Sequence, residues 1–198
     1  DVKISIRENG RILIEHGWTE MGQGVQNMAI QTLHQETGID AQLIDVEIDT
    51  NANLPTGMTT SSRATALLGN AIIDASTALR RDIEQNRSAQ IDSGQNERLK
   101  VPSGTLPVYK ETLRGLAGRT YYGKYYCDWT TKPGADVEKV ITHYSYGYAA
   151  QLVVLDDHGG IGKVYAAHDA GKIMNPMLFE GQIQGAVHMG LGYALTED

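Results

Sequence analysis

The sequence predicts an α+β protein of two-layer mixed sheets and helices, arranged as two related lobes. Short runs that alternate apolar and polar residues predict strands, and longer runs with apolar residues every three or four positions predict helices. Strands and helices are mixed along the chain, and hairpin signals are present. A second round of strands followed by a helix, after residue 140, resembles a looser repeat of the first round.

The first strands are predicted at residues 2–6 and 12–14, which flank Asn9-Gly10. This dipeptide suits a type I′ hairpin turn. A helix with one apolar stripe follows over residues 25–33, and Gly38 is a stop signal for its C-terminus. Alternation over residues 44–48 predicts the next strand.

The longest predicted helix covers residues 64–83, where apolar residues keep helical spacing over about five turns. Residues 86–106 are polar and contain Gly94, Pro102 and Gly104, which indicates a connector. We therefore expect a first lobe at 1–99 and a second lobe at 100–198.

The second lobe has weaker signals. One short helix is expected within residues 107–117, and five aromatic residues over 121–129 predict a β-like stretch. Two strands are predicted at 146–155 and 161–167. The last helix begins with Asn175 as its cap and Pro176 at its first position, and Gly181 and Gly185 within it indicate a tightly packed neighbour.

Composition restricts the partners and the compartment. The net charge of -7 over 198 residues argues against nucleic acid and against an anionic membrane surface. No run reaches the ~20 apolar residues of a membrane helix. Cys127 is the only cysteine, so a disulfide framework is excluded and a cytoplasmic location is expected. We interpret the chain as a fragment, because Asp1 opens inside a strand pattern and Asp198 ends inside a helical pattern.

Three glycine- or hydroxyl-rich helix entries are the candidate binding segments: residues 17–24, 59–65 and 175–182. Free N–H groups at a helix start favour anions, and the Gln23 amide can both donate and accept. The alternatives are a glycine-rich connection without a ligand at 17–24 and simple N-capping at 59–65. Several helix starts that converge would suit an extended cofactor with several negative charges.

The sequence shows no specific catalytic or metal-binding pattern. No pair among the six histidines has a close ligand spacing on a helix. For His168 and Asp169 we expect a strand end and a turn-stabilising contact, and for His188 a packed position. Glu20 is interpreted as a hydrogen-bonding support of the turn at 17–24. We therefore assign no catalytic residue and no metal ligand.

Four segments in order resemble motifs of the molybdenum hydroxylase family, which includes xanthine dehydrogenases and aldehyde oxidases. Thr19 to Gly24 resembles the T-E-x-G-Q-G motif, and Thr59 to Asn70 resembles a Thr/Ser-rich segment ahead of a helix. His168 to Pro176 resembles D-x-G-x-x-x-N-P, and Gly181 to Asp198 resembles a Gly-Gln-rich segment. The resemblance is closest to bacterial xanthine dehydrogenase-like subunits, and residues 127–134 resemble a selenium-dependent branch.

The resemblance implies that this chain binds molybdopterin with molybdenum, either alone or as a cytosine dinucleotide. Both lobes would then belong to the molybdenum cofactor-binding domain. The residues implied in cofactor binding lie in three segments: Gly22, Gln23, Gly24, Thr60, Ser61, Ser62, Arg63, Ala64, Thr65 and Gln182.

The complete enzyme is implied to hydroxylate a purine such as xanthine or hypoxanthine with water-derived oxygen. Electrons would leave through 2Fe-2S clusters and FAD on other segments or subunits. The alternatives are an aldehyde oxidoreductase of the same family, a non-catalytic phosphate- or nucleotide-binding module, and a structural domain that holds partner subunits. The catalytic Glu of the family lies in a later Gly-Glu motif, which Glu20 and Glu197 do not match. This fragment is therefore expected to be inactive alone.

Overall fold

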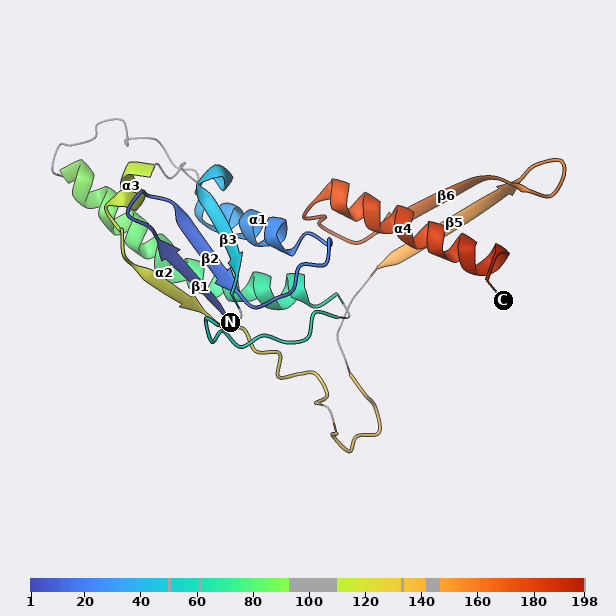
Figure 1. Ribbon diagram of the computed structural model, residues 1–198, viewed down its shortest axis with the longest axis horizontal. Helices are drawn as coiled ribbons and strands as arrows, with labels where there is room; N and C mark the ends of the chain where they lie inside the picture. The colour runs from blue at the N-terminus through green and yellow to red at the C-terminus, as the bar shows by residue number, and fades with distance from the viewer. Residues whose placement is uncertain (50, 61, 93–109, 133, 142–146, 198) are drawn as a thin grey trace. The chain divides into compact units, whose positions relative to one another are not determined.

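The hairpin predicted at the start of the chain forms and lies in the middle of a four-stranded sheet (Figure 1). In this computed structural model, β1 (Val2–Ile6) pairs antiparallel with β2 (Ile12–His16), and Ile4 lies opposite Ile14. The turn is not of type I′, which needs positive φ at both Asn9 and Gly10. Gly10 has a φ of 75°, but Asn9 is not among the residues with positive φ.

The structure describes residues 1–49, 51–60, 62–92, 110–132, 134–141 and 147–197. They divide into two compact units, Asp1–Cys127 and Asp128–Asp198. The expected lobe boundary between residues 99 and 100 lies outside the described residues.

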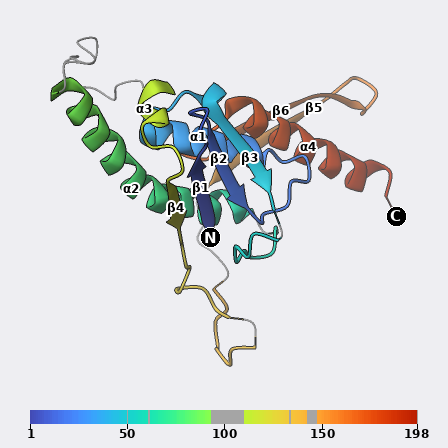
Figure 2. The same ribbon diagram turned by 60° about the vertical axis from the view of Figure 1, so that its left-hand side comes forward.

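Two helices cover one face of the first sheet (Figures 1 and 2). Helix α1 (Val25–Thr37) ends at Gly38, which has a φ of 71° and donates its N–H to the His34 carbonyl at 2.8 Å. The predicted stop signal is therefore confirmed. After a single 3₁₀ turn, η1 (Ala41–Leu43), strand β3 (Ile44–Ile48) runs parallel to β2, so α1 is the crossover connection between them.

Helix α2 (Ala64–Asp92) is longer than the sequence predicts. Residues 86–92 were expected to belong to a polar connector, but they continue the helix. Residues 86–92 contain no Gly or Pro, so none of them is a strong helix breaker. The buried side of α2 supplies Leu68, Ile72 and Leu79, none of which is exposed, to a core shared with Ile4 and Leu33.

Strand β4 (Thr120–Gly123) completes the sheet in the order β3-β2-β1-β4, after the short helix α3 (Lys110–Arg114). The predicted aromatic strand over 121–129 is shorter in the structure, because Tyr125, Tyr126 and Trp129 lie beyond β4. Asp82 on α2 anchors the strand: its carboxylate accepts from the Tyr121 hydroxyl at 2.8 Å and pairs with Arg119.

The second unit contains a hairpin and a helix. Strands β5 (Tyr148–Leu155) and β6 (Ile161–Asp169) pair antiparallel. Helix α4 (Pro176–Leu195) begins as predicted, with Pro176 in its first turn and the Asn175 side chain accepting from the Leu178 N–H at 3.1 Å. A methyl group at Gly181 or Gly185 would meet no atom within 4 Å, so the described residues contain no tight neighbour there. Among the described residues, no helix is long and apolar enough to cross a membrane.

We predict that Gly123→Ala destabilises the first unit, because a Cβ at this position would overlap the Ala71 carbonyl of α2. Overpacking of this kind costs about 1–3 kcal/mol, which urea denaturation would measure. Gly181→Ala is the matched control, since the added methyl meets nothing within 4 Å. Equal unfolding midpoints for the two variants would contradict the close approach of β4 to α2.

Candidate functional site

The turn at 17–24 is organised by the carboxylate of Glu20. One oxygen of this carboxylate accepts from the N–H groups of Gly22 at 2.9 Å and Gly24 at 3.0 Å. Its other oxygen accepts from the Gln26 N–H at 3.2 Å, in the first turn of α1. Glu20 therefore occupies the anion site that the N-terminus of α1 creates, and it supports the turn as the sequence predicted.

The electrostatics of Glu20 agree with this role. Partial burial acts to raise the pKa of its carboxyl group, but the backbone hydrogen bonds from Gly24, Gln26, Gly22 and Val25 outweigh it and hold the pKa below its usual value. Each of these N–H groups stabilises the charged form of the carboxylate. The lowered pKa makes the Glu20 carboxylate a weak base, and its oxygens already accept from backbone N–H groups, so it is unsuited to act as a general base.

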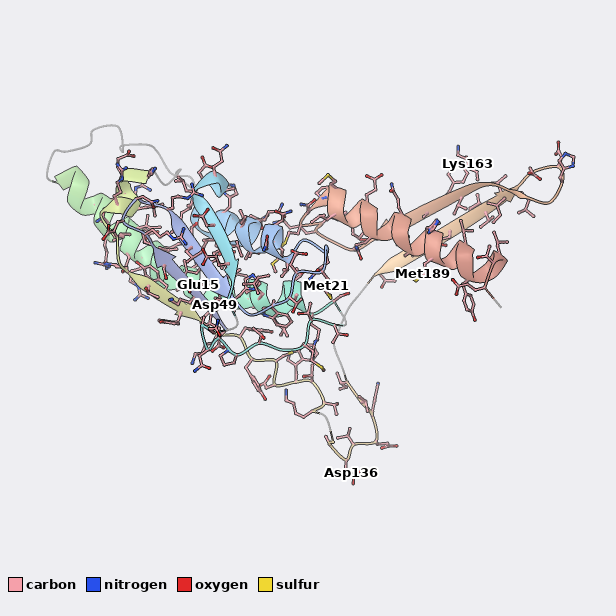
Figure 3. The ribbon with its side chains drawn as sticks, viewed as in Figure 1. Glu15, Met21, Asp49, Asp136, Lys163 and Met189 are labelled. Carbon is pink, nitrogen blue, oxygen red and sulfur yellow. The ribbon has the colours of Figure 1, made fainter. Side chains whose placement is uncertain are left out.

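The side-chain amide of Gln23 closes the same turn. Its oxygen accepts from the Met21 N–H at 2.5 Å, and its nitrogen donates to the Thr19 carbonyl at 2.8 Å. An amide nitrogen carries two protons, so this arrangement uses one of them. Met21 is 66% exposed at the tip of the turn, so this side of the turn faces solvent (Figure 3).

The structure brings the glycine turn together with the hydroxyl-rich segment before α2. The Thr19 N–H donates to the Thr59 hydroxyl oxygen at 3.1 Å, across forty residues of sequence. Trp18 is 2% exposed, and a methyl group at Gly57 would lie 3.4 Å from its ring and 3.5 Å from the Arg63 guanidinium. Two of the three predicted binding segments are therefore neighbours within the first unit.

Arg63 and Ser62 have unusual environments in the second of these segments. The Arg63 guanidinium donates to the Met58 carbonyl at 2.9 Å, but its Nε is buried and has no hydrogen-bond partner among the described residues. Ser62 has a φ of 53°, a left-handed backbone conformation that residues other than glycine rarely adopt. Strain of this kind is frequent at ligand-binding segments.

The other predicted residues of this segment have simpler positions. Thr60 is exposed, and Ala64 and Thr65 are the first residues of α2. Ser61 lies outside the described residues. Gln182 is exposed on α4 and is described within the second unit alone.

The described histidines of the second unit belong to no cluster of three or more candidate metal ligands. The Asp169 carboxylate accepts from the Gly171 N–H at 3.0 Å, which confirms its predicted role in the turn. His188 is exposed on α4, so the expectation that it is packed is wrong within its unit. The described part of the chain holds no group of three or more His, Cys, Asp or Glu residues that could bind a metal ion.

His16 was not singled out by its sequence pattern, although it directly precedes the turn. It ends β2, is fully buried, and accepts the Trp18 N–H on its Nδ1 at 3.1 Å. Burial lowers its pKa to about 4. A polar residue in the last position of a buried strand, next to a glycine-rich turn, is the signal that could have identified it.

The molybdopterin cofactor-binding domain family matches residues 1–198, the whole of the chain. One relative is the gamma subunit of the 6-hydroxypseudooxynicotine dehydrogenase complex of Paenarthrobacter nicotinovorans, 27% identical over 98% of this chain and 26% of its own length. Another is a probable xanthine dehydrogenase component of Bacillus subtilis, 28% identical over 99% of this chain and 27% of its own length. The chain thus spans about a quarter of the length of these relatives.

Solved structures show the same fold. The Cu,Mo-CO dehydrogenase superimposes with a TM-score of 0.66 over 94% of this chain and 24% of its own, at 24% identity. The aldehyde oxidoreductase of Desulfovibrio desulfuricans gives a TM-score of 0.65 over 96% of this chain and 20% of its own, at 22% identity. The predicted α+β class is therefore confirmed.

We predict that Glu20→Gln loosens the turn, because a neutral amide accepts more weakly from the N–H groups of Gly22 and Gly24. The expected loss is about 1 kcal/mol, typical of a helix cap, together with faster amide exchange at both glycines. The loss should disappear as the pH falls through the lowered pKa of Glu20, because the wild-type carboxyl then also becomes neutral. Glu8→Gln, at an exposed carboxylate of the hairpin turn, is the control and should leave both readouts unchanged.

We predict that Ser62→Gly stabilises the chain by roughly 0.5–1 kcal/mol, because glycine adopts a positive φ without steric strain. Thermal unfolding would measure the gain. Ser62→Ala is the matched control, since it removes the hydroxyl but keeps the Cβ that causes the strain. A melting temperature of Ser62→Gly at or below that of Ser62→Ala would contradict this interpretation.

Proposed function

Because this chain belongs to the molybdopterin cofactor-binding domain family, we propose that residues 17–24 and 59–65 form one wall of its cofactor site. The observation that carries this proposal is the environment of Arg63. Its buried Nε lacks an acceptor among the described residues, and it lies in a hydroxyl-rich segment joined to the glycine turn by the Thr19–Thr59 hydrogen bond. A buried cationic donor without an acceptor fits the phosphate group of a pterin cofactor.

Glu20 determines which part of the cofactor we assign to residues 17–24 and which part to residues 59–65. Its carboxylate already accepts from Gly22, Gly24 and Gln26, so an incoming phosphate would meet a negative charge at the start of α1. We therefore place the phosphate beside Thr60, Ser62 and Arg63. Gly22, Gln23 and Gly24 contact the neutral part of the cofactor, where the second proton of the Gln23 amide is a suitable donor.

The remaining implied residues complete this proposal. The resemblance also implicates Ser61, Ala64, Thr65 and Gln182 in cofactor binding, and we keep them as candidates; Ala64 and Thr65 are the first residues of α2, and Gln182 is described within the second unit alone. The cofactor is molybdopterin with molybdenum, alone or as a cytosine dinucleotide.

The complete protein is proposed to be a cytoplasmic oxidoreductase that hydroxylates a carbon of a purine or related heterocycle. When bound, the molybdenum cofactor supplies the two-electron chemistry in which a substrate C–H and water become C–OH, two protons and two electrons. The electrons leave through 2Fe-2S and FAD groups on other segments or subunits. A nitrogen heterocycle is favoured over an aldehyde because relatives are named as a nicotine 6-hydroxylase and a probable xanthine dehydrogenase. A relative named aldehyde oxidase keeps an aldehyde as the second candidate.

We assign no catalytic base to this chain, because Glu20 is a hydrogen-bonded cap and no other residue matches the Gly-Glu motif of the family. The 198 residues alone are therefore proposed to bind cofactor without hydroxylating substrate. Oxidation of hypoxanthine or xanthine by the isolated chain, reconstituted with cofactor, would contradict this.

We predict that Arg63→Gln in the full-length protein lowers the affinity for the pterin cofactor about 10- to 100-fold, because a hydrogen bond to a charged group is removed. Elemental analysis for molybdenum and the fluorescence of the released pterin measure the bound cofactor. Arg81→Gln, at an exposed position of α2, is the matched control and should retain both.

The wild-type protein decides between function classes in the same assay. Molybdenum together with pterin supports the proposed function. Binding of a phosphate or nucleotide, with neither molybdenum nor pterin present, would instead support a non-catalytic binding module. The absence of any bound ligand would support a structural domain.

A further inference from the structure

His16 joins the sheet to the glycine turn through two hydrogen bonds. Its carbonyl accepts from the Asp49 N–H at 3.2 Å, which ties the end of β2 to the residue after β3. Its ring Nδ1 accepts from the Trp18 N–H at 3.1 Å, which sets the direction in which the chain leaves the strand. The side chain is fully buried, so water cannot replace it as the acceptor for Trp18.

The hydrogen bond to Trp18 determines the tautomer of His16. A backbone N–H can only donate, so Nδ1 must present its lone pair and the ring proton must lie on Nε2. The Nε2 atom is buried and has no hydrogen-bond partner among the described residues. A second proton on the ring would convert Nδ1 into a donor that faces the Trp18 donor, and the hydrogen bond would break.

His34, at the other end of α1, has the opposite chemistry. Its Nδ1 lies 2.7 Å from the Ile39 carbonyl oxygen, which can only accept, so this nitrogen carries the proton. A doubly protonated ring would keep this hydrogen bond, because both nitrogens then donate. Protonation by acid should therefore break the His16–Trp18 hydrogen bond before α1 and leave the His34–Ile39 hydrogen bond after α1 intact.

We propose that neutral His16 is the positioning residue of the glycine turn, and that its protonation releases the turn. Trp18 connects His16 to both halves of the site. Its backbone is held by His16, its ring lies against Gly57, and the next residue donates to Thr59. Release of Trp18 therefore disturbs the alignment of residues 17–24 with 59–65. The consequence for cofactor retention rests on the proposed function, whereas the consequence for the turn does not.

Two charged groups act on His16 besides its burial. Burial lowers its pKa to about 4, the carboxylate of Glu20 acts to raise it, and the α-amino group of Asp1 acts to lower it further. The unfolded chain therefore takes up this proton first, near about pH 6.5, and the folded chain only near pH 4. The free energy of unfolding should fall as the pH decreases from about 6.5 to about 4. Above about pH 6.5, His16 is neutral in both the folded and the unfolded chain and should not affect this free energy.

The first experiment measures the tautomer in the wild-type chain by nitrogen NMR of ¹⁵N-labelled protein at pH 7. We expect a scalar coupling between the Trp18 amide nitrogen and Nδ1 of His16, with the ring proton on Nε2. His34 is the internal control, with the proton on Nδ1. A ring proton on Nδ1 of His16 at pH 7 would overturn the proposal without any variant.

The second experiment follows the turn with pH. Trp129→Phe leaves Trp18 as the only tryptophan, since the sequence contains two. We expect an acid transition in Trp18 fluorescence, with its midpoint near pH 4, where the far-ultraviolet circular dichroism still shows the fold. His16→Asn offers an amide acceptor that does not titrate, so the transition should become smaller, with only the Glu20 carboxyl of the turn still titrating, and His34→Asn should leave it unchanged.

A transition that persists unchanged in His16→Asn would overturn the proposal. Should His16→Asn fail to fold, His16→Gln takes its place, and the scalar coupling in the wild-type chain still tests the proposal.

The third measurement is the rate of pterin release from the full-length protein. We expect this rate to rise threefold or more when the pH is lowered from 7 to 4 in the wild type, and to rise less in His16→Asn. Absence of bound pterin would contradict the proposed function alone, whereas a pH-independent release rate would contradict the link between His16 and the cofactor.

Discussion

The carboxylate of Glu20 is the interaction on which the glycine turn depends. A turn that places Gly22 and Gly24 before a helix leaves several N–H groups without partners, and at this site one side chain satisfies three of them. The negative charge also complements the helix dipole of α1. From this turn, Thr19 and Trp18 contact the segment before α2.

This constraint changes how an anionic cofactor can be bound. A glycine-rich helix start is usually interpreted as a phosphate site, because its N–H groups are free. Here they are occupied by the protein's own carboxylate, so the cationic part of the site must come from elsewhere. We propose that Arg63 provides it, since it directly precedes α2 and the Thr19–Thr59 contact brings this segment beside the turn. The left-handed Ser62 directly before Arg63 shows that the backbone of this segment is held in an unfavourable conformation.

The two histidines that flank α1 illustrate how burial and partner atoms decide the chemistry of one residue type. The Nδ1 of His16 faces a donor and must be unprotonated, whereas the Nδ1 of His34 faces an acceptor and must carry a proton. Neither state could be read from the residue itself. In the first unit, the core of β1, β2, α1 and α2 holds these contacts in place, with Ile4, Ile14 and Leu33 unexposed at its centre.

The sequence by itself determined the elements and the family. Alternation predicted β1, β2 and β3, helical spacing predicted α1, α2 and α4, and the caps at Gly38 and Asn175 are where the residue types indicated. It failed where local signals compete with tertiary contacts: α2 extends through polar residues, and the Asn9-Gly10 turn adopts a different geometry. The sequence also indicated Glu20 as the support of its turn. Only the tertiary structure showed that Thr59 reaches Thr19, and that Arg63 and His16 keep buried nitrogens without partners among the described residues. These features join residues up to forty positions apart, and a local pattern carries no information about hydrogen bonds of that range.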